Sequence, residues 1–310
     1  MSLLKRAACA AAVLCLIAFF VQNAGAWGDI GHMLINRAAA EKVPASMPQF
    51  LKQAAARIEY LGPEPDRWRN PIEASLKNAQ EPDHFIDLER VADIPQLPPG
   101  RYDFYRLLYA KKLASKDHSD DYMPDKVGLQ PYITTEIYQR MVVAFREYRR
   151  LQKENKPTGG VEQNIVFYAG WLGHYVGDGA NPMHTTIQYN GWVGDNPNGY
   201  TTAKNVHYEF ESGFVQRIQQ QLTITDLVKE PVRLQHPFED YVAYLRASNG
   251  MVEKSYQLEK AGGFKETGTP EGREFVRQRL AAGAQMLLNL WYTAWEESAV
   301  PLPERRTTPQ

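Results

Sequence analysis

The sequence predicts an all-α fold, and three observations lead to this prediction. Apolar residues recur at spacings of three and four along most of the chain, which is the periodicity of amphipathic helices. No stretch of the sequence alternates apolar and polar residues over enough positions to indicate a strand. The last periodic segment runs from residue 270 to about residue 300 and stops at Pro301 and Pro303, which cannot continue a helix. We therefore expect a single compact multi-helix domain without internal repeats.

The expected helices are the stretches over which the apolar spacing holds. They cover residues 31–43, 47–60, 104–115, 131–153, 161–184, 206–221, 237–258 and 270–300. Three longer loops separate some of them: a proline-rich one at 91–101, a polar and acidic one at 116–130, and one rich in Gly, Asn and Pro at 188–204. Loops of this length in a compact domain are often functional, and Tyr189, Trp192 and Tyr200 are candidates for the mouth of a pocket.

The first 26 residues have the layout of a secretory signal peptide. Lys5 and Arg6 form a short basic region, residues 7–21 are apolar, and the small residues Ala24, Gly25 and Ala26 supply a cleavage site. An uncleaved anchor is the alternative, but the apolar run is shorter than the roughly 20 residues that a spanning helix needs. We expect cleavage between Ala26 and Trp27, a mature domain of residues 27–310, and a secreted or periplasmic location.

Composition limits the function classes. Both cysteines, Cys9 and Cys15, lie in the segment expected to be removed, and a chain of this size can bury enough apolar surface without disulfides. The same segment holds two basic residues and no acidic one, so its removal changes the formal net charge from −1 to −3. This charge gives no general attraction to nucleic acid, so local groups must attract any phosphate ester.

One segment, residues 171–184, concentrates side chains that bind zinc. His174 and Asp178 stand four positions apart and leave the same face of a helix, and His184 follows six positions later. His207 and Glu211 repeat the spacing of four. Because buried imidazoles and carboxylates are costly unless they are paired or coordinated, two such pairs indicate a metal site.

Other potential ligands are weaker when taken alone. Cleavage would give Trp27 a free α-amine with a pKa near 8, which can bind zinc together with the Trp27 carbonyl, and His32 follows five positions later. The alternative is that Trp27 is only the first packed residue. Asp66 and His84 each lie in proline-containing segments, where Asp66 can instead cap a helix.

Together these motifs resemble the superfamily that contains single-strand-specific nucleases of fungi and plants and zinc-dependent phospholipases C of bacteria. The resemblance extends from Trp27 to about Glu211, with the motifs in the same order. It implies a largely helical fold with three zinc ions at the bottom of a cleft. It assigns the first zinc to Asp66, His84, His174 and Asp178, the second to the Trp27 amine and carbonyl, His32 and the bridging Asp178, and the third to His184, His207 and Glu211.

The resemblance also implies a phosphodiester hydrolase that uses a zinc-activated hydroxide. Zinc ions that share a water can lower its pKa from about 15.7 toward 7, and Asp66 is placed to orient that water or accept its proton. Arg69 matches a cationic position of the nuclease branch and would offset charge on the phosphoryl oxygens. The alternative for Arg69 is a surface ion pair with Glu64 or Glu73.

The two branches differ in their substrates, and the motifs favour the nuclease branch. The spacing of Trp27 and His32, the pair Asp66 and Arg69, and the segment His84-Phe85-Ile86-Asp87 resemble that branch, in which the aspartate contacts a base. Candidates for base stacking are Phe85, Tyr168, Tyr175 and Trp192. Glu211 instead resembles the phospholipase branch. We expect an endonuclease or 3′-nucleotidase acting on single-stranded nucleic acid, with phospholipase C as the alternative.

Non-catalytic functions remain open from the sequence. The zinc can be structural in a binding protein, although closed structural sites use four protein ligands and the third set has three. A helical exported protein with incidental histidines would have these residues far apart. The expected partners are nucleic acid or phospholipid as substrate, and the expected state is a monomer without a stable protein partner.

Overall fold

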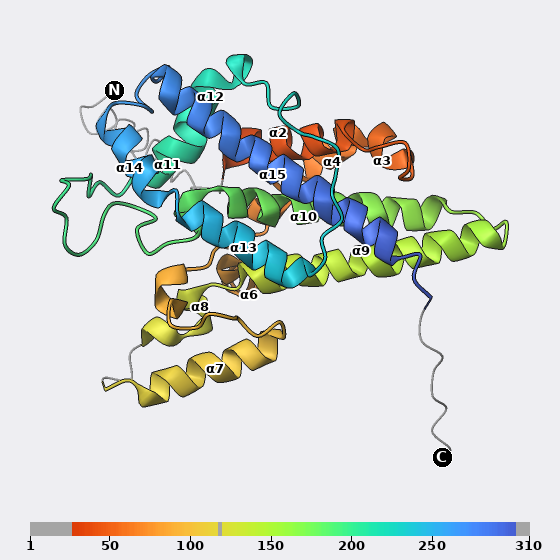
Figure 1. Ribbon diagram of the computed structural model, residues 1–310, viewed down its shortest axis with the longest axis horizontal. Coiled ribbons are helices and arrows are strands. Elements are labelled where there is room, and N and C mark those ends of the chain that lie inside the picture. The colour runs from red at the N-terminus through yellow and green to blue at the C-terminus, as the bar shows by residue number, and fades with distance from the viewer. Residues whose placement is uncertain (1–26, 117–119, 302–310) are drawn as a thin grey trace, which may run out of the picture.

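A computed structural model describes residues 27–116 and 120–301, and the regular elements of this part are all helices (Figure 1). The segment expected to be a signal peptide, residues 1–26, lies outside the described residues. Within the described part the only β contacts are two isolated bridges, Ile86 with Gly128 and Tyr189 with Gly191. No helix in this part is long and apolar enough to cross a membrane. The predicted all-α fold class is confirmed.

The helices follow the chain in the order shown in Figure 1. Their bounds are α2 Gly28–Glu41, α3 Phe50–Gln53, α4 Ala55–Leu61, α5 Glu64–Arg67, α6 Ala74–Gln80, η1 Glu81–His84, η2 Leu88–Val91, α7 Arg101–Ala114, η3 Asp120–Tyr122, α8 Pro124–Val127, α9 Gln130–Lys153, α10 Gly159–Ala180, η4 Pro182–His184, α11 Val206–Tyr208, η5 Glu209–Gly213, α12 Phe214–Ile218, η6 Gln219–Gln221, α13 Pro237–Asn249, α14 Val252–Lys260 and α15 Pro270–Glu297.

Several predicted boundaries were wrong. The helix expected at 47–60 is two helices that meet at Ala54, and the one expected at 237–258 is interrupted at Gly250 and Met251. The segment 161–184 leaves the α-helix at Ala180, because Asn181 is extended and its side chain accepts a hydrogen bond from the N–H of Met183. The sequence also gave no signal for the short helices α5, α6 and α8, which have few residues over which a period can be recognised.

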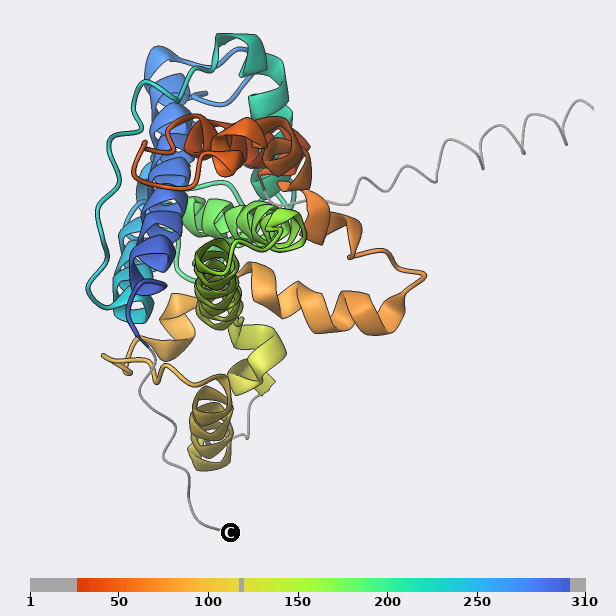
Figure 2. The same ribbon diagram turned by 90° about the vertical axis from the view of Figure 1, so that its right-hand side faces the viewer.

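Helix α10 is the centre of the domain. It packs against α2, α4, α9, α13 and α15, and Figures 1 and 2 show these helices around it, with α7 and α8 on the periphery. The close approach of α2 depends on Gly173, where an added Cβ would lie 1.8 Å from Asn36 Oδ1. Asn36 is fully buried and donates to the carbonyls of Ile58 and Gly170. This hydrogen bonding fixes α2, α4 and α10 in register, which places the ligand-type residues of α2 and α10 side by side.

Candidate metal centre and its cavities

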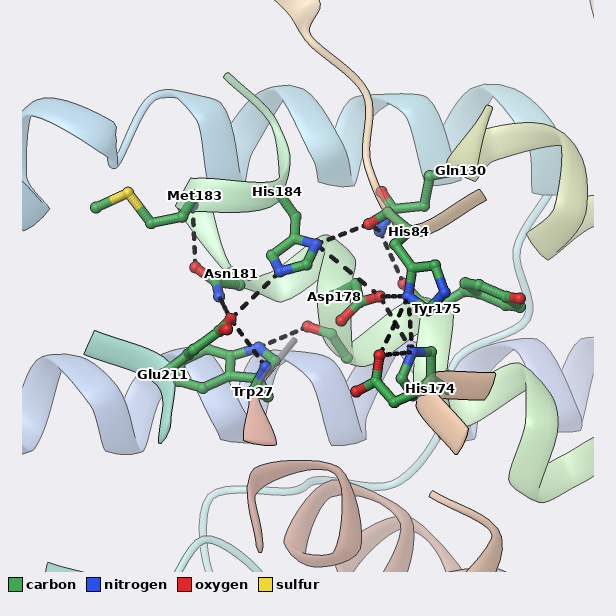
Figure 3. Close-up of polar contacts among 12 residues, drawn as sticks. Trp27, His84, Gln130, His174, Tyr175, Asp178, Asn181, Met183, His184 and Glu211 are labelled. Carbon is green, nitrogen blue, oxygen red and sulfur yellow. Dashed lines mark hydrogen bonds and ion pairs between the residues drawn. The ribbon is translucent and has the colours of Figure 1, made fainter. Parts of the chain in front are cut away.

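The ligand-type side chains converge from six segments of the chain. His32 comes from α2, Asp66 from α5, His84 from η1, and His174 and Asp178 from α10. We call these five residues the Asp178 group. His184 of η4 joins His207 and Glu211 of the α11–η5 segment, and we call these three the Glu211 group. Figure 3 shows His84, His174 and Asp178 of the first group and His184 and Glu211 of the second facing the same interior space.

Asp178 is the hub of its group. Its Oδ2 lies 3.2 Å from His84 Nδ1 and 3.4 Å from His174 Nε2, and its Oδ1 lies 3.3 Å from His32 Nε2. Asp66 Oδ1 lies 3.8 Å from the same His84 nitrogen and 3.9 Å from the same His174 nitrogen. The two imidazole nitrogens are themselves 3.0 Å apart. Asp66 Oδ1, His84 Nδ1, His174 Nε2 and Asp178 Oδ2 therefore surround one point.

The Glu211 group forms a smaller triangle. The Nε2 atoms of His184 and His207 are 3.1 Å apart, and they lie 3.3 Å and 2.9 Å from Glu211 Oε2. His184 Nδ1 lies 3.9 Å from Asp178 Oδ2, which connects the two groups. Asn181 donates from Nδ2 to Glu211 Oε2 at 3.0 Å, so the carboxylate is held by the turn that ends α10.

Backbone carbonyls orient two of the imidazoles. The Nδ1 of His174 is 2.9 Å from the carbonyl of Gly62, and the Nδ1 of His184 is 2.8 Å from the carbonyl of His84. A carbonyl only accepts, so each Nδ1 carries the proton and each Nε2 presents a lone pair to the centre. Gln130 Nε2 donates to the carbonyl of His84 and so supports this arrangement. Sequence reasoning missed Gln130, because nothing local marks it.

These residues fit zinc. Ligands about 2.05 Å from a tetrahedral zinc lie roughly 3.3 Å from each other, and the distances within both groups scatter around that value. Asp66 Oδ2, His84 Nε2 and Glu211 Oε1 are buried and have no hydrogen-bond partner within residues 27–116 and 120–301. Three sets of ligand atoms can hold an ion: His84, His174 and Asp178; His184, His207 and Glu211; and His32, Asp66 and His174.

The ligands expected for the second zinc, Trp27, His32 and Asp178, do not all lie together in the structure. His32 and Asp178 lie together, as the resemblance implied. The backbone nitrogen of Trp27, however, donates to Glu211 Oε2 at 3.0 Å, so its hydrogen-bond partner belongs to the Glu211 group. The Trp27 side chain is fully buried and donates to the carbonyl of Gly177 at 2.7 Å. Trp27 is thus both a packed residue and a neighbour of the centre.

Burial dominates the electrostatics of the centre. It raises the pKa of Asp178 well above its usual value, against the attraction of His184, and it raises the pKa of Asp66. Burial also lowers the pKa values of His84 and His174 well below the usual value, so both imidazoles are neutral and can act as ligands. Burial also raises the pKa of Glu211. The attraction of His207 and His184 outweighs this effect, so the pKa of Glu211 is lowered to about 2.

Two cavities flank the centre. Cavity A has a volume of about 780 Å³ and is lined by His84, His184 and His207 of the two groups. Cavity B has a volume of about 740 Å³ and is lined by Trp27 and Asp66. The residues that line both cavities are Arg69, Glu81 and Tyr208. The centre is therefore accessible from two sides.

Arg69 lies on the wall between the cavities. It pairs with Asp66 at 3.2 Å and with Glu81 at 3.6 Å, so the alternative of a surface pair with Glu64 or Glu73 is wrong. Phe85 and Asp87 line cavity A. Asp87 is buried, accepts from Arg90 Nε at 3.1 Å, and burial raises its pKa to about 6.

Most of the aromatics expected to stack on a base lie elsewhere. Tyr175 is fully buried and bonds to Gln80, while Trp192 packs against Tyr200 and Tyr256 to anchor its loop. Tyr168 lines a separate surface hollow on α9 and α10. Cavity A instead presents Phe85, Tyr189 and Tyr208. Tyr208 was missed, although its position next to His207 was a signal that could have identified it.

Comparison with known proteins adds little to this geometry. No protein-family model matches the chain, and no curated protein matches it. Among solved structures, the chain is similar to the alpha toxin from Clostridium absonum, with a TM-score of 0.42 and 12% identity over 88% of this chain and 66% of that one. It is also similar to Clostridium perfringens alpha-toxin from an avian strain, with a TM-score of 0.40 and 14% identity over 88% of this chain and 65% of that one. The chain spans about two thirds of the length of each.

Proposed function

We propose that this protein is a zinc-dependent phosphodiester hydrolase. The observation that carries the proposal is the convergence of the Asp178 and Glu211 groups on a point reached from two cavities. A purely structural zinc would be enclosed by four protein ligands. The Glu211 group supplies three, and His207 keeps 16% of its side chain exposed beside cavity A. The arrangement therefore leaves room for a substrate or water.

The residues that would hold zinc are Asp66, His84, His174 and Asp178 for one ion, His184, His207 and Glu211 for another, and His32 with Asp178 and Trp27 for a third. Bound zinc would supply Lewis acidity at the phosphoryl group and make a water molecule easier to deprotonate. His174 and His184 keep their Nδ1 protons on backbone carbonyls, so neither ring turns away from the centre.

Asp66 and Arg69 are the residues we assign to the reaction itself. Asp66 Oδ2 has no hydrogen-bond partner in the described part of the chain, and the residue borders cavity B, so it can accept a proton from the attacking water. The water oxygen bonds to phosphorus while one phosphorus–oxygen ester bond breaks, which yields a phosphomonoester and an alcohol. Arg69 stands 3.2 Å from Asp66 and offsets the charge on the phosphoryl oxygens.

For the substrate, we propose single-stranded nucleic acid first. Phe85, Tyr189 and Asp87 line cavity A, so it offers aromatic faces for a base and a buried carboxyl group for its polar edge. One observation favours a phospholipid as the second candidate. The apolar side chains of Ile72 and Leu76 are 85% and 42% exposed. They are neighbours in sequence of Lys77, which lines cavity B, and of Asn78, which lines cavity A. Such an apolar rim suits a lipid surface.

The deciding experiment compares substrates under one set of conditions. The chain from Trp27 to Gln310 is loaded with zinc and incubated separately with single-stranded DNA, single-stranded RNA and phosphatidylcholine vesicles, each with and without a chelator. We expect chelator-sensitive cleavage of at least one nucleic acid. Cleavage of phosphatidylcholine alone would replace the nuclease assignment with the phospholipase one. Absence of cleavage of all three and of simple phosphodiesters, by protein that contains zinc, would contradict the hydrolase proposal.

We also propose that the protein is exported and that residues 1–26 are removed. The support is the placement of Trp27, whose nitrogen lies in a buried hydrogen bond to Glu211 at the edge of the centre. A new amino terminus at this position would place an α-amine, which offers a lone pair once it is deprotonated, directly beside the proposed ligands. Sequencing the amino terminus of the exported protein tests this proposal, and a terminus other than Trp27 would contradict it.

A further inference from the structure

The turn that follows α10 contains a fully buried amide side chain, Asn181, which is a ligand in neither group (Figure 3). The α-helix stops at Ala180 because Asn181 precedes Pro182, and a residue before proline is restricted to an extended conformation. The φ and ψ angles of Asn181 are −80° and 117°. Asn181 is thus the first residue after the helix that carries Asp178, and it begins the turn that carries His184.

Both the backbone and the side chain of Asn181 are hydrogen-bonded to the centre. Its N–H donates to the carbonyl of Asp178 at 2.9 Å, and its carbonyl accepts from the N–H of His184 at 3.1 Å. Its side-chain Oδ1 accepts from the N–H of Met183 at 3.0 Å, and its Nδ2 donates to Glu211 Oε2 at 3.0 Å. One residue therefore connects the hub of the Asp178 group with a histidine and the carboxylate of the Glu211 group.

The bond from Met183 determines which end of the amide faces Glu211. A backbone N–H only donates, so the atom that it reaches is Oδ1, and the Nδ2 donor points at the carboxylate. The Trp27 nitrogen reaches the same carboxylate oxygen at 3.0 Å, but it is itself a proposed ligand. Asn181 is thus the donor to Oε2 that has no part of its own in binding metal. The other oxygen, Oε1, is buried without a hydrogen-bond partner in the described part of the chain.

We propose that Asn181 is a positioning residue that holds the Glu211 carboxylate in the orientation in which the Glu211 group binds zinc. The inference rests on the proposed function and adds to it a residue outside the ligand sets. Hydrogen-bond partners of ligating side chains fix the orientation of the ligand, and their loss typically lowers metal affinity by about 10- to 100-fold. The alternative is that Asn181 only caps η4, through the bond that its Oδ1 accepts.

Substitution with serine separates these two roles. The Asn181→Ser side chain keeps an oxygen that can accept from the N–H of Met183, and serine caps helices about as well as asparagine does, but it extends no amide donor to Glu211. Asn181→Ala removes both contacts. The matched control is Asn196→Ser, because Asn196 also accepts from a backbone N–H and donates to a carbonyl, both of Tyr200, and lines neither cavity.

Each variant is prepared from Trp27 onward and loaded with zinc, and the zinc that it retains per chain is measured against increasing chelator. We expect one ion to bind about ten-fold or more weakly in both Asn181→Ser and Asn181→Ala, while the other ions bind as in the unsubstituted protein. Asn196→Ser should change none of them. In protein loaded with cadmium-113, Asn181→Ser should shift the NMR resonance that is missing from Glu211→Gln and leave the others in place.

Zinc affinity at the unsubstituted level in Asn181→Ser, with only Asn181→Ala weakened, would make Asn181 a helix cap and overturn this inference while the hydrolase proposal stands. Unchanged affinity in both variants would overturn it too, as would an equal loss at every ion, which indicates a general structural role. If Asn181→Ser does not fold, Asn181→Thr keeps an oxygen for the same cap and replaces it. Failure of the unsubstituted protein to bind zinc would instead contradict the proposed function.

Discussion

The Asp178 group and the Glu211 group are built from the same kinds of side chain, but the chain positions them differently. His174 and Asp178 lie four residues apart on a regular helix, at the centre of the domain. His207 and Glu211 are also four apart, yet Glu211, which is buried as well, lies in a π-helical turn, Glu209–Gly213. Such turns occur mostly as single insertions and often at functional sites.

The two groups also differ in the balance between burial and charge at their carboxylates. Asp178, His32 and His174 are fully buried, and burial outweighs the attraction of His184 at the Asp178 carboxylate. At Glu211 the attraction of two imidazoles outweighs burial, and His207 reaches toward cavity A. We infer that a bound cation would offset a larger electrostatic cost at the Asp178 group than at the Glu211 group, where two imidazoles already lie within 3.3 Å of the carboxylate.

The largest effect is expected from Asp178→Asn. The hub carboxylate lies within 3.4 Å of nitrogens of His32, His84 and His174, so its neutral replacement weakens every ion that those residues would hold. We expect zinc content to fall by more than one ion per chain and kcat to fall roughly 1,000-fold or more. Metal analysis and diester hydrolysis measure these two quantities.

The control for this substitution is Asp226→Asn, because Asp226 is exposed and pairs only at the surface with Arg277. Asp226→Asn should change neither the zinc content nor kcat. Full zinc content together with full activity in Asp178→Asn would show that Asp178 is not the hub and would remove the basis of the comparison.

A smaller effect is expected from Glu211→Gln. Only His184 and His207 share its Oε2 as ligand-type side chains, so we expect the loss of about one zinc ion and a decrease in kcat of roughly 100-fold. Glu209→Gln is the matched control, since Glu209 lies in the same turn but faces Arg217 at the surface. If Glu211→Gln removed as much zinc as Asp178→Asn does, the two groups would be a single cooperative site.

An extra residue before Trp27 should have a still smaller effect. The Trp27 nitrogen donates to Glu211 Oε2, and an added residue would turn an amine into an amide that cannot bind metal. We expect the chain that begins at Trp27 to exceed the extended chain by about ten-fold in kcat, at the same pH and zinc concentration. Equal rates with equal zinc content would show that the Trp27 amine has no part in the centre.

The sequence predicted the helical parts of the centre better than the loops. His174 with Asp178 and His207 with Glu211 were identifiable because a spacing of four fixes the face of a helix, and His184 was identifiable because it follows Asp178 by six positions. Asp66 and His84 were assigned by resemblance, since helices α5 and η1 are too short for a period to show. Their meeting with α10 depends on long-range contacts that no local pattern encodes.

The cavities were the least predictable part. Tyr175 and Trp192 were candidates for a stacking surface, but one is buried behind His84 and the other anchors a loop. Aromatic residues pack at the same spacing whether they face a core or a cavity, so periodicity alone does not separate the two cases. The position of Arg69 on the wall between cavities A and B likewise became visible only when the turn after α5, η1 and α11 were placed together.

We expect the smallest effect on catalysis from Gly173→Ala. This substitution also tests how α10 supports the Asp178 group. The added Cβ would lie 1.8 Å from Asn36 Oδ1 and 2.8 Å from a Leu287 methyl carbon, so α2 must move away from α10. We expect the free energy of unfolding to fall by about 1–3 kcal/mol, measured by urea denaturation of the zinc-loaded protein.

Gly160→Ala on the same helix is the control, because an added Cβ meets nothing within 4 Å there, and it should raise stability by up to about 1 kcal/mol. Because His32 is carried by α2 and His174 by α10, the shift in Gly173→Ala should weaken zinc binding at the Asp178 group and spare the Glu211 group. Equal losses at both groups would mean that the spacing of α2 and α10 does not distinguish them.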